Sequence, residues 1–264
     1  MSDSLKCTLI QTELLWEDIN GNLDLLATKV MAIGEPTDLI ILPEMFTTGF
    51  SMTPKHLAED MNGQTVKWMG SIAEKANATL MGSCIIEDGG KYFNRFIAAS
   101  PNGAVSTYDK KHLFTLAGEN EEYTAGRDRL ILEINGWKIF PLICYDLRFP
   151  VWSRSKKEVE SMYEYDLMIY IANWPAPRIN AWDSLLKARA IENQAYCIGV
   201  NRLGTDGNNL KYPGHSIVAD FGGNLMADLG SEDTIKTISL ERKSMEEFRK
   251  RLPFLADGDK FGFP

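Results

Sequence analysis

Residues 39–44 read Leu-Ile-Ile-Leu-Pro-Glu, an apolar run that ends at a proline and a carboxylate. An uninterrupted apolar run of this length is typical of a strand that is buried on both faces, as in a parallel sheet. Apolar residues at helical spacing precede the run, from Asn22 onward, and follow it over residues 65–77. This order of helix, strand and helix predicts an α/β protein.

The alternation continues along the chain, with turns at residues 101–103 and 135–136 that join strands directly and therefore favour mixed sheets. A helix is expected over residues 180–194, and a short charged helix from Ser244. For the tail after Phe254, two interpretations stay open, contact with a partner subunit or no fixed contact. The other expected strands are residues 7–11, 79–86, 95–100, 104–108, 130–134, 137–143, 166–172, 196–201, 216–219, 225–228 and 234–240.

Composition indicates a soluble globular protein. The chain has 264 residues, of which 44% are hydrophobic and 24% are charged. No stretch has the composition of a linker, so we expect a single domain over residues 1–264, with a core of about 6–240 and a C-terminal extension of 241–264. The formal charge of −8 argues against a nucleic-acid partner, because phosphate binding needs clustered cations.

The remaining sequence signals favour a cytoplasmic protein without a metal site. The first residues lack the apolar core of a signal peptide, and no apolar run has membrane-spanning length, so no membrane partner is expected. The four cysteines, Cys7, Cys84, Cys144 and Cys197, lie far apart without metal-ligand spacing. They are interpreted as free thiols.

Three expected strand ends carry reactive side chains, namely Glu44, Lys110 and Cys144. Ligands of α/β sheets gather at the carboxyl ends of strands. Taken singly, each residue has an ordinary explanation as a surface carboxylate, a solvated lysine or an inert core thiol. Together they supply a nucleophile, a base and a cation, which is the set that attack on a carbonyl requires.

The sequence after Cys144 predicts a turn from strand to helix, with Asp146 at the N-cap position. Backbone N–H groups at such a turn stabilise a thiolate and also an oxyanion. Two forms of the nucleophile stay open, a thiolate or a thiol that gives its proton to a base. Glu44 is the strongest candidate for the base, and His112 is the alternative.

These motifs resemble the nitrilase superfamily, whose members use a Glu–Lys–Cys triad. The matching segments are residues 42–46 around Glu44, 108–114 around Lys110 and 143–149 around Cys144. A second family glutamate precedes an aromatic by four residues, which selects Glu119 before Tyr123, with Glu121 and Glu122 as rivals. Residues 173–175 and 189–193 also match, so the resemblance spans about residues 6–240.

The resemblance implies an α-β-β-α four-layer sandwich with mixed β-sheets, assembled as a homodimer or larger homo-oligomer. It implies that Glu44, Lys110, Cys144 and Glu119 are catalytic. Glu119 would orient Lys110 or, in the alternative interpretation, merely neutralise its charge. No metal or organic cofactor is implied.

The closest branch is that of the ω-amidases, which act on 2-oxoglutaramate and related 2-oxo acid amides. The implied reaction releases ammonia from a small amide through a thioester acyl-enzyme. Two alternatives remain: another hydrolase of the superfamily, with an N-carbamoyl amide or nitrile substrate, and a catalytically silent binding protein on the same fold.

Substrate recognition is assigned to aromatic residues beside the catalytic positions, Phe46, Tyr145 and Trp174. For Trp174 a second interpretation stays open, namely that it is a core aromatic. Arg148 and Arg178 are available cations for a substrate carboxylate, but neither is assigned to the substrate, since Arg148 could equally support the catalytic turn through an ion pair.

Overall fold

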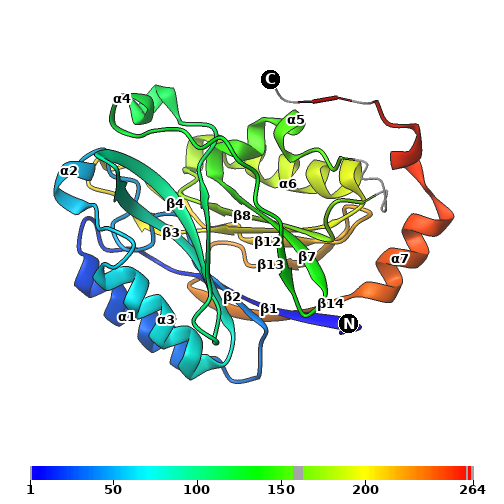
Figure 1. The fold of residues 1–264 in the computed structure, drawn as a ribbon, viewed down its shortest axis with the longest axis horizontal. Helices are drawn as coiled ribbons and strands as arrows, with labels where there is room; N and C mark the ends of the chain where they lie inside the picture. Colours follow the sequence, from blue (N-terminus) through cyan, green and yellow to red (C-terminus); the bar gives the residue numbers. More distant parts are fainter. Residues whose placement is uncertain (1, 157–162, 260, 263–264) are drawn as a thin grey trace.

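The computed structural model describes residues 2–156, 163–259 and 261–262. Two six-stranded mixed sheets lie face to face, and helices cover the outer face of each (Figure 1). The predicted α-β-β-α four-layer sandwich is therefore confirmed.

The first sheet has the strand order β14-β1-β2-β3-β4-β5. Its inner strands β1, β2 and β3 are parallel, while β14, β4 and β5 are antiparallel to their neighbours. The parallel strands direct their carboxyl ends to one edge of the sandwich. The strands are β1 (Ser4–Gln11), β2 (Leu39–Ile41), β3 (Thr79–Asp88), β4 (Lys91–Ala99), β5 (Val105–Asp109) and β14 (Thr234–Glu241).

The second sheet repeats this plan in the order β13-β12-β9-β8-β7-β6, with β7, β8 and β9 parallel. A small separate hairpin, β10-β11, follows β9. The strands are β6 (Leu132–Ile134), β7 (Trp137–Ile143), β8 (Leu167–Ala172), β9 (Tyr196–Asn201), β10 (Leu203–Thr205), β11 (Lys211–Pro213), β12 (Ile217–Ala219) and β13 (Leu225–Asp228).

Helices α1 and α3 cover the first sheet, and α6 covers the second with α5 beside it (Figure 1). Helix α7 and the tail extend along the side of the molecule that holds the N-terminus. The helices are α1 (Ile19–Met31), α2 (Pro54–Leu57), α3 (Gln64–Ala76), α4 (Glu119–Glu122), α5 (Pro150–Ser153), α6 (Ile179–Asn193) and α7 (Arg242–Arg251). Short 3₁₀ turns are η1 (Thr115–Ala117), η2 (Cys144–Arg148), η3 (Ala176–Arg178) and η4 (Phe254–Asp257).

Strand β2 and the next residue, Leu42, form a continuous apolar run because both faces of this segment are buried. Leu39 and Ile41 belong to the core between the two sheets, whereas Ile40 and Leu42 belong to the core under α1 and α3. All four side chains are fully buried. Burial of one such side chain is worth roughly 1.5–3 kcal/mol, so both cores depend on this strand.

The C-terminal helix begins at Arg242, two residues before the predicted start. It docks on the second sheet through Arg249, whose guanidinium lies 2.9 Å from Asp166 and also donates to the backbone oxygen of Gln194. The elements α2, α4 and β10-β11 were not predicted, because three or four residues are too few to show a period.

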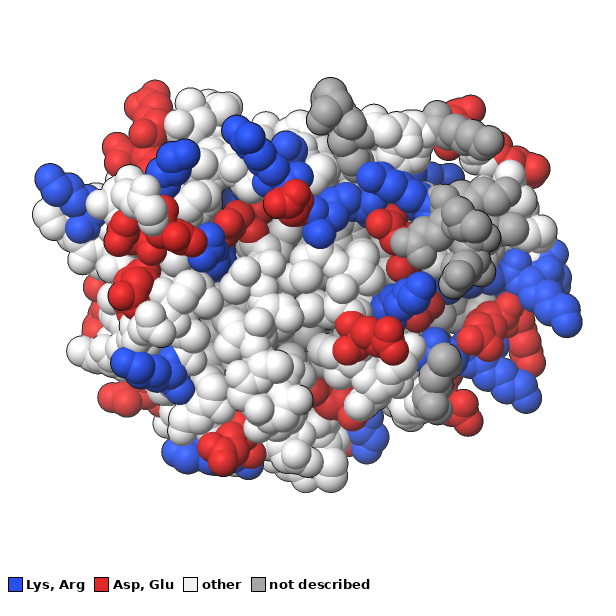
Figure 2. All heavy atoms as spheres, in the orientation of Figure 1, with Lys and Arg blue, Asp and Glu red and all other residues white. Residues whose placement is uncertain are grey.

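Charged side chains of both signs are interspersed on the face shown in Figure 2, around a central area of uncharged residues. None of the helices in the described part of the chain is both long enough and apolar enough to span a membrane.

Candidate active site

The carboxyl ends of β2, β5 and β7 bring the three predicted strand-end residues together. Glu44 follows β2, Lys110 follows β5 and Cys144 follows β7. Lys110 Nζ lies 2.9 Å from Glu44 Oε1, and the charge of Glu44 acts directly on the Cys144 thiol. The two halves of the sandwich therefore contribute to one cluster.

Lys110 lies between two carboxylates. Its Nζ atom is 2.9 Å from both carboxylate oxygens of Glu119, in addition to the contact with Glu44. The side chains of all three residues are fully buried. Of the three candidate glutamates, Glu119 is the one bound to Lys110, whereas Glu121 and Glu122 are exposed.

Hydrogen bonds fix the carboxylate of Glu44 on both of its oxygens. Asn94 donates its side-chain amide to Oε1 at 2.8 Å, and the backbone N–H of Asn173 donates to Oε2 at 2.8 Å. The side chain of Asn173 donates to the backbone oxygen of Glu44 at 2.6 Å. The Cys144 sulfur lies 3.9 Å from the backbone oxygen of Asn173, so this residue adjoins both acid and thiol.

The backbone at Cys144 is strained, with a φ of 43° in the left-handed region. Such a conformation costs about 1–2 kcal/mol for a residue with a side chain. The 3₁₀ turn begins at Cys144 itself, so Asp146 is not the N-cap that the sequence suggested. Its carboxylate instead reaches back and accepts the N–H of Ile143 at 3.0 Å.

Asp146 joins this turn to the segment that carries Lys110. It is fully buried, and it accepts the hydroxyl of Tyr108 at 2.8 Å and the backbone N–H of His112 at 3.0 Å. The ring of His112 also bonds to it, with Nδ1 at 2.8 Å from Oδ1. His112 is thus engaged behind the turn, and the structure does not place it as a base for Cys144.

Electrostatics favour a protonated Cys144 in the resting site. Burial raises the pKa of the thiol well above its ordinary value, and the charge of Glu44 raises it further, while Lys110 opposes both effects. Of the two forms left open by the sequence, the thiol is therefore favoured, and it needs a base. Burial lowers the pKa of Lys110, but Glu119 and Glu44 outweigh this effect, so its net pKa is raised and the amine stays charged.

Glu44→Gln is expected to lower the pKa of the Cys144 thiol, because it removes a negative charge and leaves Lys110 in place. The thiol pKa can be measured from the pH dependence of alkylation by iodoacetamide, with Cys144→Ala as the blank. Glu121→Gln removes an exposed carboxylate and should leave the thiol pKa unchanged. An unchanged or higher thiol pKa in Glu44→Gln would contradict the placement of Glu44 against the sulfur.

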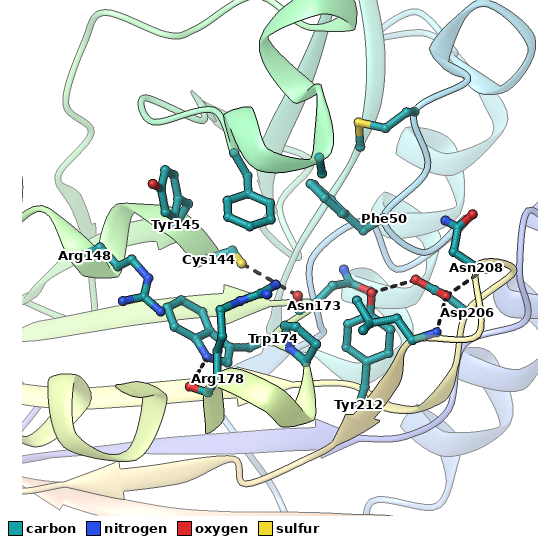
Figure 3. A pocket seen from close by; sticks show the side chains of 15 residues that line it. Phe50, Cys144, Tyr145, Arg148, Asn173, Trp174, Arg178, Asp206, Asn208 and Tyr212 are labelled. Carbon is teal, nitrogen blue, oxygen red and sulfur yellow. Dashed lines mark hydrogen bonds between the residues drawn. The ribbon is translucent and has the colours of Figure 1, made fainter. Parts of the chain in front are cut away.

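A cavity of about 250 Å³ opens at Cys144 (Figure 3). Tyr145 and Trp174 line it, at the positions that the sequence assigned to substrate recognition. Trp174 is also a core aromatic, because its ring is almost completely buried and lies 5.4 Å from that of Trp182. The two interpretations of this residue are therefore compatible.

Phe46 does not line the cavity, so its assignment to the substrate is corrected. Its ring is fully buried in the core under α1 and α3, 5.9 Å from that of Trp68. Phe46 shares this core with Ile40 and Leu42, which precede it at two-residue spacing. Phe50 lines the cavity instead, and its ring centroid is 4.9 Å from Lys110 Nζ.

Several other lining residues were not predicted as site residues. Phe114 lies within the lysine motif, but nothing in the sequence distinguished it from a core aromatic. Asp206 comes from the segment between β10 and β11, and Tyr212 lies within β11, where no periodic pattern exists. Arg148 and Arg178, the two cations left unassigned, both line the cavity.

Among residues 2–156, 163–259 and 261–262, no three His, Cys, Asp or Glu side chains are grouped so as to hold a metal ion.

A four-layer sandwich with a cysteine against a buried glutamate–lysine cluster defines the class of hydrolases that act on carbon–nitrogen bonds. The model of the family described as carbon-nitrogen hydrolase matches residues 6–250. The chain belongs to this family, which is part of the nitrilase superfamily.

Individual relatives agree with this assignment. The chain is 43% identical over 260 residues to the protein named omega-amidase YafV of Escherichia coli strain K12, covering 97% of this chain and 98% of the relative. It is 32% identical over 223 residues to a 2-oxoglutaramate amidase of Bacillus subtilis, covering 83% and 84%.

Among solved structures, a CN-hydrolase superfamily protein of Xanthomonas campestris superposes with a TM-score of 0.97 at 41% identity, covering 100% of both chains. That structure is described as having an arsenic adduct in its active site.

Proposed function

We propose that this protein is an ω-amidase, which hydrolyses 2-oxoglutaramate or a related 2-oxo acid amide and releases ammonia. The observation that carries the proposal is the contact of Lys110 with both Glu44 and Glu119 beside the Cys144 thiol, at the base of a small cavity. The similarity to proteins named omega-amidase and 2-oxoglutaramate amidase supports the substrate class.

In the first step, Glu44 takes the proton of the Cys144 thiol as the sulfur attacks the amide carbon. A base is needed because the raised pKa of Cys144 keeps the thiol protonated. Asn94 and the backbone of Asn173 hold the Glu44 carboxylate in one orientation, so the proton acceptor faces the sulfur without rearrangement.

The negative charge that develops on the carbonyl oxygen is stabilised by Lys110 and by the backbone N–H of Tyr145. An ammonium group has three N–H donors. Lys110 uses one on Glu44 and can share another between the two oxygens of Glu119, which leaves one donor for the substrate. One donor of this kind contributes roughly 3–4 kcal/mol to a transition state.

The tetrahedral intermediate collapses when Glu44 returns its proton to the departing nitrogen, which leaves as ammonia. The acyl group then remains on Cys144 as a thioester. Glu44 next takes a proton from a water molecule that attacks the thioester, and the acid product and the free thiol are restored. Throughout these steps Glu119 holds the amine of Lys110 in position, in addition to neutralising its charge.

Ammonia release from a panel of substrates tests the proposal, with 2-oxoglutaramate, simple amides, a nitrile and an N-carbamoyl amine as members. We expect 2-oxoglutaramate to have the highest kcat/KM, at least about tenfold above the others, because its carboxylate adds binding energy. A different best substrate would overturn the ω-amidase assignment while leaving the mechanism intact. No turnover of any member would favour a silent binding protein.

We also propose that the protein acts in the cytoplasm as a homodimer or larger homo-oligomer of single-domain chains. Exposed apolar side chains on the outer layer support the assembly. Val151 on α5 is 58% exposed and Ile191 on α6 is 54% exposed. The mass of the protein in solution tests this proposal.

A further inference from the structure

The ring of Phe50 lies against the buried ammonium group of Lys110, at the wall of the cavity. Phe50 lines the cavity (Figure 3), and its ring centroid is 4.9 Å from Lys110 Nζ. The side chain of Lys110 has no exposed surface, whereas the neighbouring Cys144 is partly exposed and also lines the cavity. The cavity therefore gives a ligand access to the thiol, while an apolar ring lies beside the lysine.

The ammonium group of Lys110 has one donor that is not needed by the two glutamates. Of its three N–H groups, one serves Glu44 and a second can be shared between the two oxygens of Glu119. In the part of the chain that the structure describes, no other oxygen lies within hydrogen-bond distance of Nζ. The face of the Phe50 ring attracts a cation, but it is a weaker acceptor than an oxygen atom. The third donor is therefore held in the resting site without a strong partner.

A water molecule beside Lys110 would weaken this arrangement. It would accept the third N–H group, and the developing oxyanion would first have to displace it. A charged donor also stabilises negative charge more strongly where water is excluded, because the local dielectric constant is lower. An apolar side chain next to Lys110 can therefore act on the transition state through the lysine.

Backbone contacts hold Phe50 in this position. The residue before it, Gly49, has a φ of 72°, in the left-handed region that glycine adopts without strain. The residue after it, Ser51, accepts the hydroxyl of Tyr123 on its backbone oxygen at 2.7 Å. The backbone N–H of Tyr123 donates to the backbone oxygen of Glu119 at 2.8 Å. The segment that carries Phe50 is thus bonded to the residue that ends the turn of Glu119.

We propose that Phe50 is a positioning residue, which excludes water from Lys110 and thereby reserves one N–H of its ammonium group for the oxyanion. This inference rests on the proposed function, and it adds a residue that acts through Lys110 rather than on the acyl group. The other interpretation is that Phe50 only packs against the substrate, as is open to Leu210, another apolar residue of the lining. Packing against the substrate would affect KM, whereas water exclusion affects kcat.

Initial rates with 2-oxoglutaramate test the proposal in wild type, Phe50→Leu and Phe50→Ala. Leucine keeps most of the apolar volume that excludes water, and alanine does not. We expect Phe50→Ala to lower kcat about 30-fold with KM within about threefold of wild type, and Phe50→Leu to keep kcat within about fivefold. Leu210→Ala is the comparison, because it shortens an apolar side chain of the lining between β10 and β11 and should change KM rather than kcat.

The same substitution in the Lys110→Met background shows whether Phe50 acts through the lysine. With no ammonium group to protect, Phe50→Ala should lower the remaining kcat by less than about threefold. A loss as large as in the wild-type background would overturn the proposal, and so would a loss in Phe50→Ala that is confined to KM. A loss in Phe50→Leu as large as that in Phe50→Ala would also overturn it, since leucine excludes water too.

The aldehyde 5-oxopentanoate tests the same contact without turnover of an amide. Its aldehyde carbon bonds reversibly to the Cys144 sulfur, which places an oxygen at the oxyanion position, whereas pentanoate lacks the aldehyde. By calorimetry, Phe50→Ala should bind 5-oxopentanoate about 30-fold more weakly than wild type, and its affinity for pentanoate should change by less than about threefold. Equal changes for both ligands would overturn the positioning role. Failure of wild type to hydrolyse 2-oxoglutaramate would instead refute the proposed function, and the aldehyde would still decide the role of Phe50.

Discussion

Replacing Cys144 with alanine is expected to abolish ammonia release, lowering kcat by roughly 10⁴-fold or more. The sulfur is the atom that becomes bonded to the acyl group, so no other residue of the cluster can replace it. The loss should be confined to chemistry, because alanine keeps the same backbone and removes one atom that faces the cavity. The free energy of unfolding should therefore change by less than about 1 kcal/mol.

Mass spectrometry of the enzyme mixed with substrate provides a second measurement. Wild type should gain the mass of the acyl group, and Cys144→Ala should not. Cys7→Ala is the matched control, since Cys7 is fully buried between the sheets and burial raises the pKa of its thiol far above its ordinary value. Ammonia release that persisted in Cys144→Ala would refute the thioester mechanism.

Much of the fold could be predicted because its central strands are buried on both faces. Strand β7 was predicted at its observed bounds, and the helix predicted over residues 180–194 was observed at Ile179–Asn193. In a long segment, the period of the apolar residues predicts which side chains are buried. The hairpin β10-β11 was missed because its strands have three residues each, and its position is set by contacts with distant residues, such as the hydrogen bond of 2.9 Å from the backbone N–H of Leu203 to the backbone oxygen of Thr12.

The candidate catalytic cluster was easier to predict than the cavity around it. Glu44, Lys110 and Cys144 each follow a strand, and parallel strands must deliver their ends to one edge. The cavity depends instead on which way each side chain near the catalytic residues points. Phe46 was misassigned because its position close to Glu44 in sequence was taken as closeness to the cavity. It lies with Ile40 and Leu42 in the core under α1 and α3, while Phe50 reaches the site.

The contacts of Asn94 and Asn173 with Glu44 were not predicted either. Asn94 lies within β4, where a polar residue alternates with apolar ones in any half-buried strand. Its burial beside Glu44 follows from the register of β4 against β5, which places Lys110 next to Asn94 through a backbone hydrogen bond of 3.0 Å. Register between strands depends on the whole sheet rather than on one segment.

Lys110→Met should both inactivate the enzyme and destabilise it. Activity should fall by at least about 10³-fold, because the developing oxyanion loses its charged donor. Stability should fall by about 3–5 kcal/mol, since Glu44 and Glu119 are left fully buried without a counter-charge. Initial rates and urea unfolding measure the two effects. Lys111→Met is the neighbouring control, and its partly exposed amine lies 5.2 Å from the ring of Trp152, outside the cluster.

The destabilisation of Lys110→Met should depend on pH in a defined direction. Burial raises the pKa of Glu119 even with Lys110 present, and removal of Lys110 removes the opposing effect. A carboxyl whose pKa is higher in the folded state than in the unfolded state favours folding in acid, and this advantage is lost as the pH rises through the folded-state pKa. The variant should therefore be closest to wild type below about pH 4, and furthest from it near neutrality. A stability deficit that is constant with pH would show that lost packing, not charge, is the cause.

The double variant Lys110→Met with Glu119→Gln separates the two roles of the lysine. With Glu119 neutral, Glu44 is the one remaining charge of the three residues, and it retains its hydrogen bonds from Asn94 and Asn173. Most of the lost stability should return, so the two substitutions should be strongly non-additive in the free energy of unfolding. Activity should stay as low as in Lys110→Met, because the oxyanion donor is still missing. If both stability and activity returned, Lys110 would serve only to neutralise the glutamates, and the oxyanion would have to be held by backbone N–H groups.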